Sequence, residues 1–252
     1  MRATTAVVVA ALVALGVPTG ATAATTTTGV VRAGVAPTGP STTALTASTT
    51  AAVPALRRGS RGSAVLAAQQ RLSALGYWLG TPDGTFGPLT EQAVLALQGA
   101  AGLARDGVLG PRTRRALDAG VVPVARTRSG DAVEVVRGAG LLLVVDDGRV
   151  RTVLHTSTGT DRYYTNAQGQ RRLADTPAGT FRVTRAEDGW RDAPLGRLYR
   201  PRYFHPDGIA VHGSTSIPAY PASHGCARVS TAAMDMIWSR KLMPIGSTVV
   251  VR

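Results

Sequence analysis

The sequence predicts an α+β protein with two folded parts, a small three-helix bundle followed by a larger domain rich in β-strands. Residues 55–119 place apolar side chains at helical spacing between glycine turns that occur twice. Residues 124–252 contain short runs of Val and Leu separated by turn residues. The chain has 252 residues, of which 44% are hydrophobic, and this supplies enough apolar material for both cores.

The first 54 residues are not expected to join either core. Arg2 precedes an uncharged apolar run over 6–17, and Ala21-Thr22-Ala23 then matches a small-residue cleavage site. This run is shorter than the roughly 20 residues that a spanning helix needs, so residues 1–23 are predicted to be a signal peptide. Residues 24–54, rich in Thr, Ala and Pro, predict a flexible linker. We therefore expect a secreted, extracytoplasmic protein with no stable membrane span after signal removal.

The formal net charge of +13 comes almost entirely from arginine, since Lys241 is the only lysine. The arginines are scattered from Arg57 to Arg252, without the basic tract interleaved with aromatic residues that would indicate nucleic-acid binding. Two interpretations stay open: a GC-rich genome that encodes arginine for any cation, and attraction to an anionic wall polymer.

The helical part contains an internal repeat. Residues 83–90 read DGTFGPLT, and residues 106–113 read DGVLGPRT. Asp-Gly favours a tight turn, and Gly-Pro suits a helix start, because proline lacks an N–H that the first turn leaves unbonded. With Gly59, Gly62, Gln69 and the turn at 75–77, this stretch resembles the peptidoglycan-binding domain found in wall hydrolases and transpeptidases. The resemblance implies wall binding; a purely structural or spacing role is the alternative.

In the second part, the predicted strands are short. Val- and Leu-rich runs indicate strands over residues 132–136, 141–145, 150–156, 180–184, 209–211 and 248–251, and a helix over 231–241. His212 would then end an apolar strand and project from its edge.

Cys226 is the one cysteine of the chain, so no disulfide can form within it. A thiol attacks an amide as a thiolate, which needs an adjacent base or a positive field. Two of the four histidines, His212 and His224, lie within 14 residues of Cys226. A chain that doubles back through Pro218 and Pro221 would bring the His212 imidazole to the sulfur. Amides near Gly225 and Cys226 are candidates for an oxyanion hole.

The motifs His212-Gly213 and Ser223-His224-Gly225-Cys226-Ala227-Arg228 resemble those of the L,D-transpeptidase catalytic domain, which has the YkuD-type fold. Thr176, Pro177, Gly179 and Phe181 resemble another motif of that family, at the start of a strand. The resemblance covers residues 124–252, with a short lid of 10 residues between His212 and Ser223.

This resemblance implies roles for the site residues. Cys226 would be the nucleophile and His212 the general base, with the Gly213 carbonyl orienting the imidazole. His224 is expected to support the turn rather than to transfer protons directly, and Ser223 to brace it. Arg228 would fix the cysteine turn or bind a substrate carboxylate, which its planar fork suits. Gly225 and Tyr203 complete the candidate substrate-binding set.

The remaining histidines and aromatic residues carry weaker signals. His155 and His205 lie in no motif and are expected to be incidental. Tyr199, Tyr203, Phe204 and Trp190 are candidates for lining a peptide groove, although core packing explains them at least as well. No Cys, His or Asp spacing suggests a metal site, and the implied chemistry requires no cofactor.

The implied reaction is acyl transfer on peptidoglycan stem peptides, with a Cys226 thioester and an amine acceptor that completes a cross-link. The alternatives are an L,D-carboxypeptidase that uses water, attachment of another amine-bearing partner, and a non-catalytic wall-binding protein. Peptidoglycan stem peptides and glycan are the expected partners. The resemblance also implies acylation by carbapenem-type inhibitors.

Overall fold

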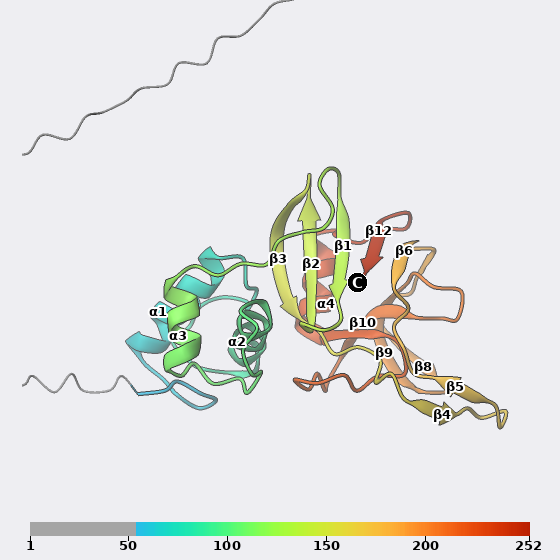
Figure 1. Cartoon of the computed structure of the whole chain (residues 1–252), viewed down its shortest axis with the longest axis horizontal. Helices are drawn as coiled ribbons and strands as arrows, with labels where there is room; N and C mark the ends of the chain where they lie inside the picture. Colours follow the sequence, from blue (N-terminus) through green and yellow to red (C-terminus); the bar gives the residue numbers. More distant parts are fainter. Residues whose placement is uncertain (1–53) are drawn as a thin grey trace, which may run out of the picture. The chain divides into compact units, whose positions relative to one another are not determined.

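A computed structural model describes residues 54–252 of the chain (Figure 1). The predicted signal peptide and almost all of the predicted linker lie outside the described residues. Within residues 54–252, no helix is long and apolar enough to cross a membrane.

Three helices form the first folded part: α1 (Ser63–Ala74), α2 (Pro88–Ala100) and α3 (Pro111–Asp118). Pro88 and Pro111 are the first residues of α2 and α3, where a missing N–H has no cost, and a glycine precedes each. The three helices meet in a core of apolar side chains, which includes Val65, Leu72, Val94, Leu97 and Leu117.

Two buried glutamines explain why the repeat reads as it does. The Gln69 amide donates to Asp83, to Thr90 and to the Thr85 carbonyl, and its oxygen accepts the N–H groups of residues 83 and 84. Gln98 repeats this pattern, because its amide donates to Asp106, Thr113 and the Val108 carbonyl while its oxygen accepts the Gly107 N–H. The Asp, Gly and Thr of both repeat units therefore satisfy a buried amide, which is a structural task.

The second part is built on two sheets. The first has the order β3-β2-β1-β12-β6, from strands β1 (Ala132–Val136), β2 (Leu141–Asp146), β3 (Arg149–His155), β6 (Gly179–Arg182) and β12 (Thr248–Val251). The second has the order β11-β10-β9-β7, with β8 also paired to β9. Its strands are β7 (Arg185–Ala186), β8 (Trp190–Ala193), β9 (Gly196–Tyr203), β10 (Ala210–Ser214) and β11 (Ala227–Ser230).

The first sheet is buried on both faces, which explains the unbroken apolar run of β2. Leu141, Leu143 and Val145 pack into the same core as the helices α1–α3. Leu142 and Val144 point to the opposite face, where a second core contains side chains of β10, β11 and helix α4 (Thr231–Ser239). Successive side chains of a strand point to opposite faces, so a strand covered on both sides carries no polar alternation.

Backbone contacts also join the helical part to the first sheet. The Trp78 N–H donates to the Val153 carbonyl at 3.1 Å, and the Val153 N–H donates to the Gly76 carbonyl at 2.8 Å. Gly99 of α2 lies so close to the β1–β2 turn that an added Cβ would be 2.2 Å from the Ala139 carbonyl oxygen. The helices therefore share a tightly packed interface with the sheet.

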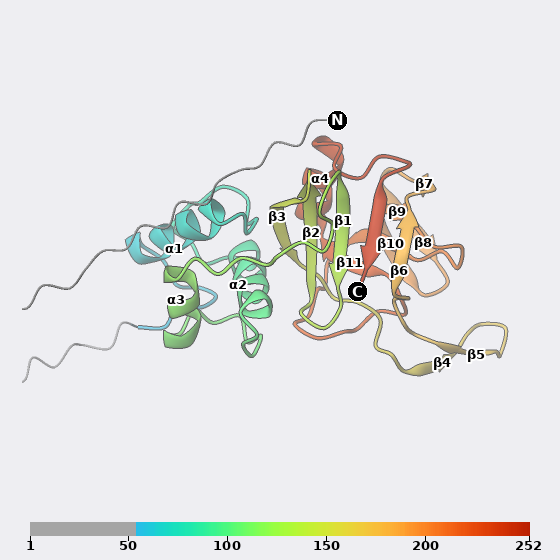
Figure 2. The ribbon, with the colours of Figure 1, turned by 45° about the horizontal axis from the view of Figure 1, so that its top comes forward.

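A separate hairpin of β4 (Tyr163–Thr165) and β5 (Arg171–Leu173) projects away from both sheets, as Figures 1 and 2 show. Its strands are short, polar and largely exposed, so no pattern in the sequence predicted this hairpin.

The predicted α+β class is confirmed, and the six predicted strands and the helix after Cys226 are all present within two to three residues of their expected ends. One expectation was wrong. His212 does not end its strand, because β10 continues to Ser214, and His212 is buried within this interior strand between β9 and β11.

Candidate active site

A cavity of about 740 Å³ contains most of the side chains singled out in the sequence. Its lining includes His212, Ser223, His224, Cys226 and Arg228. Tyr203 instead lines a second cavity of about 390 Å³, to which Cys226 also contributes. Cys226 therefore faces both cavities.

Parallel pairing of β10 with β11 brings the two motifs together. Val211 pairs with Ala227 and His212 with Arg228, so Cys226 directly precedes the residues that pair with the histidine strand. After β10, the loop 215–222 carries the chain back to the end of the sheet at which β10 begins. The sulfur and the imidazole thus reach one cavity from adjacent strands.

His212 is fixed as a neutral base. Its Nδ1 lies 2.8 Å from the Gly213 carbonyl oxygen, and because a carbonyl only accepts, Nδ1 carries the proton. The lone pair is then on Nε2. Burial, with a smaller effect from the nearby Arg228 charge, lowers the pKa of His212 to about 4. The imidazole is therefore uncharged at neutral pH and able to accept a proton.

The Cys226 sulfur is held as a thiol. Burial raises the pKa of Cys226 above its ordinary value, although the Ala210 N–H, 3.4 Å from Sγ, and the Arg228 charge act in the opposite direction. No hydrogen bond joins the two described side chains of His212 and Cys226. The resting state is therefore a neutral thiol and a neutral imidazole that line the same cavity.

The cysteine turn is braced from inside by Ser223. Its hydroxyl donates to the Cys226 carbonyl at 2.6 Å and accepts the Gly225 N–H at 3.0 Å. This second bond bears on the expected oxyanion hole, because the Gly225 N–H is already donated within the turn. The Cys226 N–H, for which no bond is found among the described residues, is the better candidate donor.

Gly225 and Thr176 fit each other behind the turn. Gly225 has a φ of +143°, and an added Cβ would lie 2.8 Å from the Asp175 carbonyl oxygen, so only glycine fits. The fully buried Thr176 hydroxyl donates to the Gly225 carbonyl at 2.6 Å and accepts the Gly159 N–H at 2.9 Å. The Thr-Pro motif noted in the sequence therefore supports the cysteine turn.

The loop between His212 and Ser223, expected to be a lid, does not form the main wall of the cavity. Residues of this loop are tied instead to the first sheet and to the helices. His155 Nε2 bonds to the Pro218 carbonyl at 2.9 Å, and the Gln92 amide of α2 donates to the Ile217 carbonyl at 3.2 Å. His155, expected to be incidental, is thus a buried structural residue whose pKa burial lowers.

The cavity walls come from two hairpins that the sequence analysis did not associate with the site. Tyr164, Arg172 and Leu173 line it from the β4–β5 hairpin. Trp190, Leu195 and Arg197 line it from the β8–β9 hairpin. His224 is exposed and packs edge-on against Tyr164, with ring centroids 4.6 Å apart, so it links the cysteine turn to the first hairpin.

The candidate aromatic residues divide between the core and the cavity. Phe204 is buried in the core, and Tyr203 is largely buried beneath the Arg185 guanidinium. Tyr199 packs behind the strands near α4, and only Trp190 is both exposed and part of the larger cavity. His205 lies away from the Cys226 cavity, against Phe181.

The cavity has a cationic lining. Arg171, Arg172, Arg197 and Arg228 contribute to it against Asp175 and Asp207. Such a site favours a ligand that carries carboxylates. Among the described residues, no group of three His, Cys, Asp or Glu side chains could hold a metal ion.

Two family models match different parts of the chain. The family model described as the L,D-transpeptidase catalytic domain matches residues 130–251, and a peptidoglycan binding domain model matches residues 61–117. The crystal structure of the L,D-transpeptidase from Xylanimonas cellulosilytica is 49% identical with a TM-score of 0.77, covering 80% of this chain and 98% of that one.

Two N-acetylmuramoyl-L-alanine amidases also show similarity over short stretches. CwlL of Bacillus licheniformis is 48% identical over 66 residues, which is 25% of this chain and 18% of the amidase. CwlM of Mycobacterium tuberculosis is 45% identical over 56 residues, which is 22% of this chain and 14% of the amidase. The chain thus spans less than a fifth of the curated relatives it matches.

Proposed function

Because this chain belongs to the L,D-transpeptidase family, we propose that it cross-links peptidoglycan stem peptides through a thioester on Cys226. The observation that carries this proposal is the neutral His212 imidazole. Its free Nε2 and the Cys226 sulfur face one cavity large enough for a peptide.

In the first step, the Cys226 sulfur attacks the carbonyl carbon of the third stem residue while its proton passes to His212 Nε2. The C–S bond forms and a tetrahedral oxyanion develops, for which the Cys226 N–H is the candidate donor. The bond to the terminal D-alanine then breaks, and its nitrogen takes the proton from His212. A thioester and free D-alanine result.

In the second step, an amine of a neighbouring stem attacks the thioester carbonyl. His212 accepts the proton of that amine and returns it to the departing sulfur, so the resting neutral pair is restored. The two half-reactions use the same base in the same protonation states, which suits a histidine whose pKa burial has lowered.

The cavity charge supports a substrate of this class. A stem tetrapeptide carries carboxylates, and the side chains of Arg172 and Arg228 line the cavity. We assign Arg228 to substrate carboxylate or turn fixation, and Ser223, Gly225 and His224 to support of the cysteine turn.

We further propose that the protein works at the cell wall, with residues 1–23 as its export signal, 24–54 as a linker, 55–119 as the wall-binding part and 124–252 as the catalytic part. The similarity to the peptidoglycan binding domain and to wall amidases supports this placement. Because the repeat residues mostly satisfy Gln69 and Gln98, a glycan would be bound by other surfaces of α1–α3.

The identity of the acyl acceptor distinguishes a transpeptidase, which uses an amine, from an L,D-carboxypeptidase, which uses water. Purified protein is incubated with a stem tetrapeptide, and the products are separated by mass. Cross-linked dimer is the expected product. Tripeptide without any dimer would mean that water is the acceptor and would replace transpeptidase by L,D-carboxypeptidase. Unchanged tetrapeptide would favour a non-catalytic wall-binding protein.

A further inference from the structure

The pairing register of strands β9 and β10 shifts at His212. Val211 pairs with Arg202 and Gly213 pairs with Tyr199, so a single residue of β10 faces two residues of β9. Those two residues are Arg200 and Pro201. An extra residue in one strand is a β-bulge, which bends the strand and redirects the side chains beside it. Here the bulge lies directly opposite the candidate general base.

Arg200, the first residue of the bulge, has an unfavourable backbone conformation. Its φ is +50°, in the left-handed region that residues with a Cβ rarely adopt and that glycine adopts freely. Residues held in such conformations persist where surrounding contacts fix them, and they concentrate at functional sites. An arginine at this position therefore indicates that contacts of its side chain offset the unfavourable backbone conformation.

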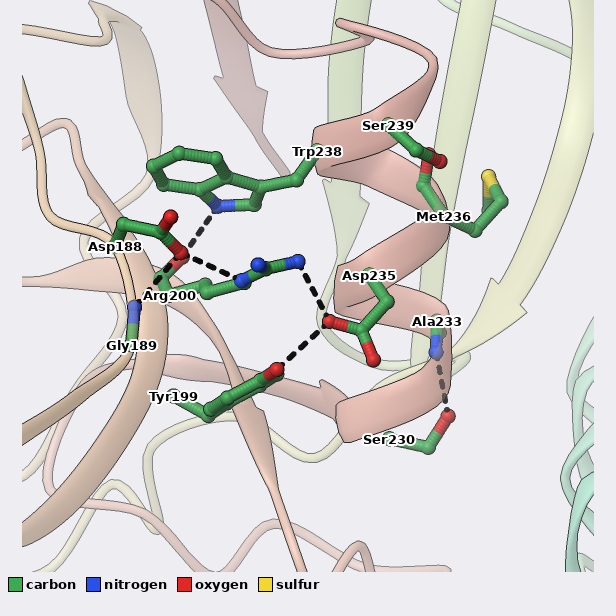
Figure 3. A network of polar contacts seen from close by, with 10 residues as sticks. All are labelled: Asp188, Gly189, Tyr199, Arg200, Ser230, Ala233, Asp235, Met236, Trp238 and Ser239. Atoms are coloured by element: carbon green, nitrogen blue, oxygen red, sulfur yellow. Dashed lines mark hydrogen bonds and ion pairs between the residues drawn. The ribbon is translucent and has the colours of Figure 1, made fainter.

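Contacts from two elements outside its own strand hold Arg200 in place (Figure 3). Its Nε lies 2.7 Å from Asp188 Oδ1, in the β7–β8 turn, and its Nη1 lies 2.8 Å from Asp235 Oδ1, on α4. The same Asp235 oxygen accepts the Tyr199 hydroxyl at 2.9 Å, and the Arg200 carbonyl accepts the Trp238 indole N–H at 2.9 Å. We call these five residues the Arg200 clamp: Asp188, Tyr199, Arg200, Asp235 and Trp238.

The clamp reaches His212 through Gly213. A Cβ at Gly213 would lie 2.9 Å from Tyr199 and 3.1 Å from both Thr231 and Met234 of α4. The Gly213 backbone is therefore in close contact with Tyr199, a member of the clamp. The Gly213 carbonyl is the group that orients His212 Nδ1. Anything that moves Tyr199 or the bulge therefore moves the acceptor that sets the imidazole.

The exposure of the ion pairs argues against a purely stabilising purpose. The side chains of Arg200, Asp235 and Asp188 are 28%, 48% and 63% exposed. Ion pairs this accessible contribute little to global stability. They can still help to hold one arrangement of the bulge.

We propose that the Arg200 clamp is a positioning device that holds the bulge opposite His212 and so aims Nε2 at the Cys226 sulfur. Arg200 and Asp235 are its positioning residues, and neither touches the reacting atoms. This inference rests on the proposed function, because it assumes that His212 is the base for Cys226.

The test measures alkylation of Cys226, the chain's one cysteine, by iodoacetamide in the full-length protein at pH 7 and pH 10. At pH 7 the reaction needs His212 to remove the thiol proton, whereas raising the pH to 10 increases the share of the thiol that hydroxide ionises without it. Arg200→Gly suits the left-handed backbone but removes the ion pairs. We expect it to react about tenfold more slowly at pH 7, part of the 10²- to 10⁴-fold that a general base supplies, and to recover to within about twofold at pH 10.

Asp235→Asn provides a second variant that keeps the side-chain shape, and it should show the same recovery. Lys241→Gly is the matched control, since Lys241 is also a cation with a φ of +52° but lies outside the clamp. It should behave as wild type.

Two results would contradict the role of the clamp but leave the role of His212 intact, provided that His212→Ala still reacts slowly at pH 7. One is wild-type reactivity of both Arg200→Gly and Asp235→Asn at pH 7, and the other is an equal loss at both pH values. If His212→Ala itself reacts at the wild-type rate at pH 7, the proposed role of His212 fails, and the clamp's role fails with it.

Discussion

At the scale of single residues, the site depends on two groups whose pKa values burial moves in opposite directions. The pKa of His212 falls to about 4 while burial raises that of Cys226, so both groups are neutral at neutral pH. A neutral pair avoids burying two charges, which would be costly in the interior. In the mechanism that we propose, proton transfer is then coupled to attack rather than completed beforehand.

This arrangement predicts the acid side of the pH profile. Because His212 becomes protonated only near pH 4, the rate of acyl transfer should be nearly constant between pH 7 and pH 5 and fall below that. Initial rates measured across this range with a stem tetrapeptide check it. A decline centred near 6.5, the ordinary histidine value, would show that the imidazole is not desolvated.

The same pKa shift affects folding stability. Between pH 6.5 and 4 the unfolded chain binds a proton at position 212 that the folded chain does not, so stability falls as the pH falls. His212 alone should cost about 2 kcal/mol between pH 7 and pH 5. Denaturant unfolding at both pH values measures the loss, and His212→Gln should reduce it. An equal loss in the variant would assign the effect to other groups, of which buried His155 is the first to consider.

The sequence singles out Cys226 and His212 because their motif is compact and Cys226 is unique, and the structure places both side chains at one cavity, while their roles stay predictions. Sequence reasoning placed the oxyanion donors less well, since Gly225 donates its N–H to Ser223 and only coordinates show that. It also missed Arg200 and Asp235. No sequence signal marks an arginine in a left-handed conformation, because the condition that permits it is a set of contacts 35 to 38 positions apart.

At the scale of elements, the cysteine turn is stable because buried polar groups behind it are satisfied. Thr176 is the connecting residue, with one hydroxyl that serves both Gly225 and Gly159. Strands β10 and β11 then fix the turn relative to His212.

Replacing that hydroxyl should loosen the turn. Thr176→Val keeps the shape but leaves a buried carbonyl and a buried N–H without partners, which should lower the free energy of unfolding by about 2–4 kcal/mol. Reactivity of Cys226 should fall as well. Chemical unfolding and intact-mass kinetics measure the two effects. Thr180→Val, at an exposed position on β6, is the control, and equal behaviour of the two variants would contradict this role of Thr176.

Elements with strong periodicity were predictable, and those without it were not. The run 141–145 is apolar throughout because β2 is covered on both faces, and that signal is strong. The hairpin of β4 and β5 forms a cavity wall, yet its residues are exposed and polar, so no apolar pattern distinguishes it from a loop. The position of His212 in an interior strand likewise depends on which strands flank β10, and topology decides that.

At the scale of the described chain, the helical part shares a core with the first sheet. Leu141, Leu143 and Val153 are buried in the same cluster as Leu97 of α2, and Gln92 of α2 bonds to the loop that joins His212 to Cys226. The sequence predicted two separate parts, because periodicity within each part carries no record of how they pack.

This interface can be tested at its tightest point. Gly99→Ala would place a Cβ 2.2 Å from a backbone oxygen of the β1–β2 turn, so α2 must move away from the sheet. We expect a loss of about 1–3 kcal/mol in unfolding free energy and faster proteolysis between the two parts. Gly138→Ala, in the same turn but with open space around it, is the matched control. An unaltered Gly99→Ala protein would mean that the parts are not packed together in solution.

Covalent catalysis by Cys226 is tested by the intact mass of the protein after brief mixing with a stem tetrapeptide donor. We expect wild type to gain the mass of the donor minus D-alanine, as a hydroxylamine-sensitive adduct on Cys226. The adduct should be absent from Cys226→Ala and strongly reduced in His212→Ala at pH 7. An adduct that persists in Cys226→Ala, or a wild-type protein that releases D-alanine without passing through any adduct on this sulfur, would contradict covalent catalysis by Cys226.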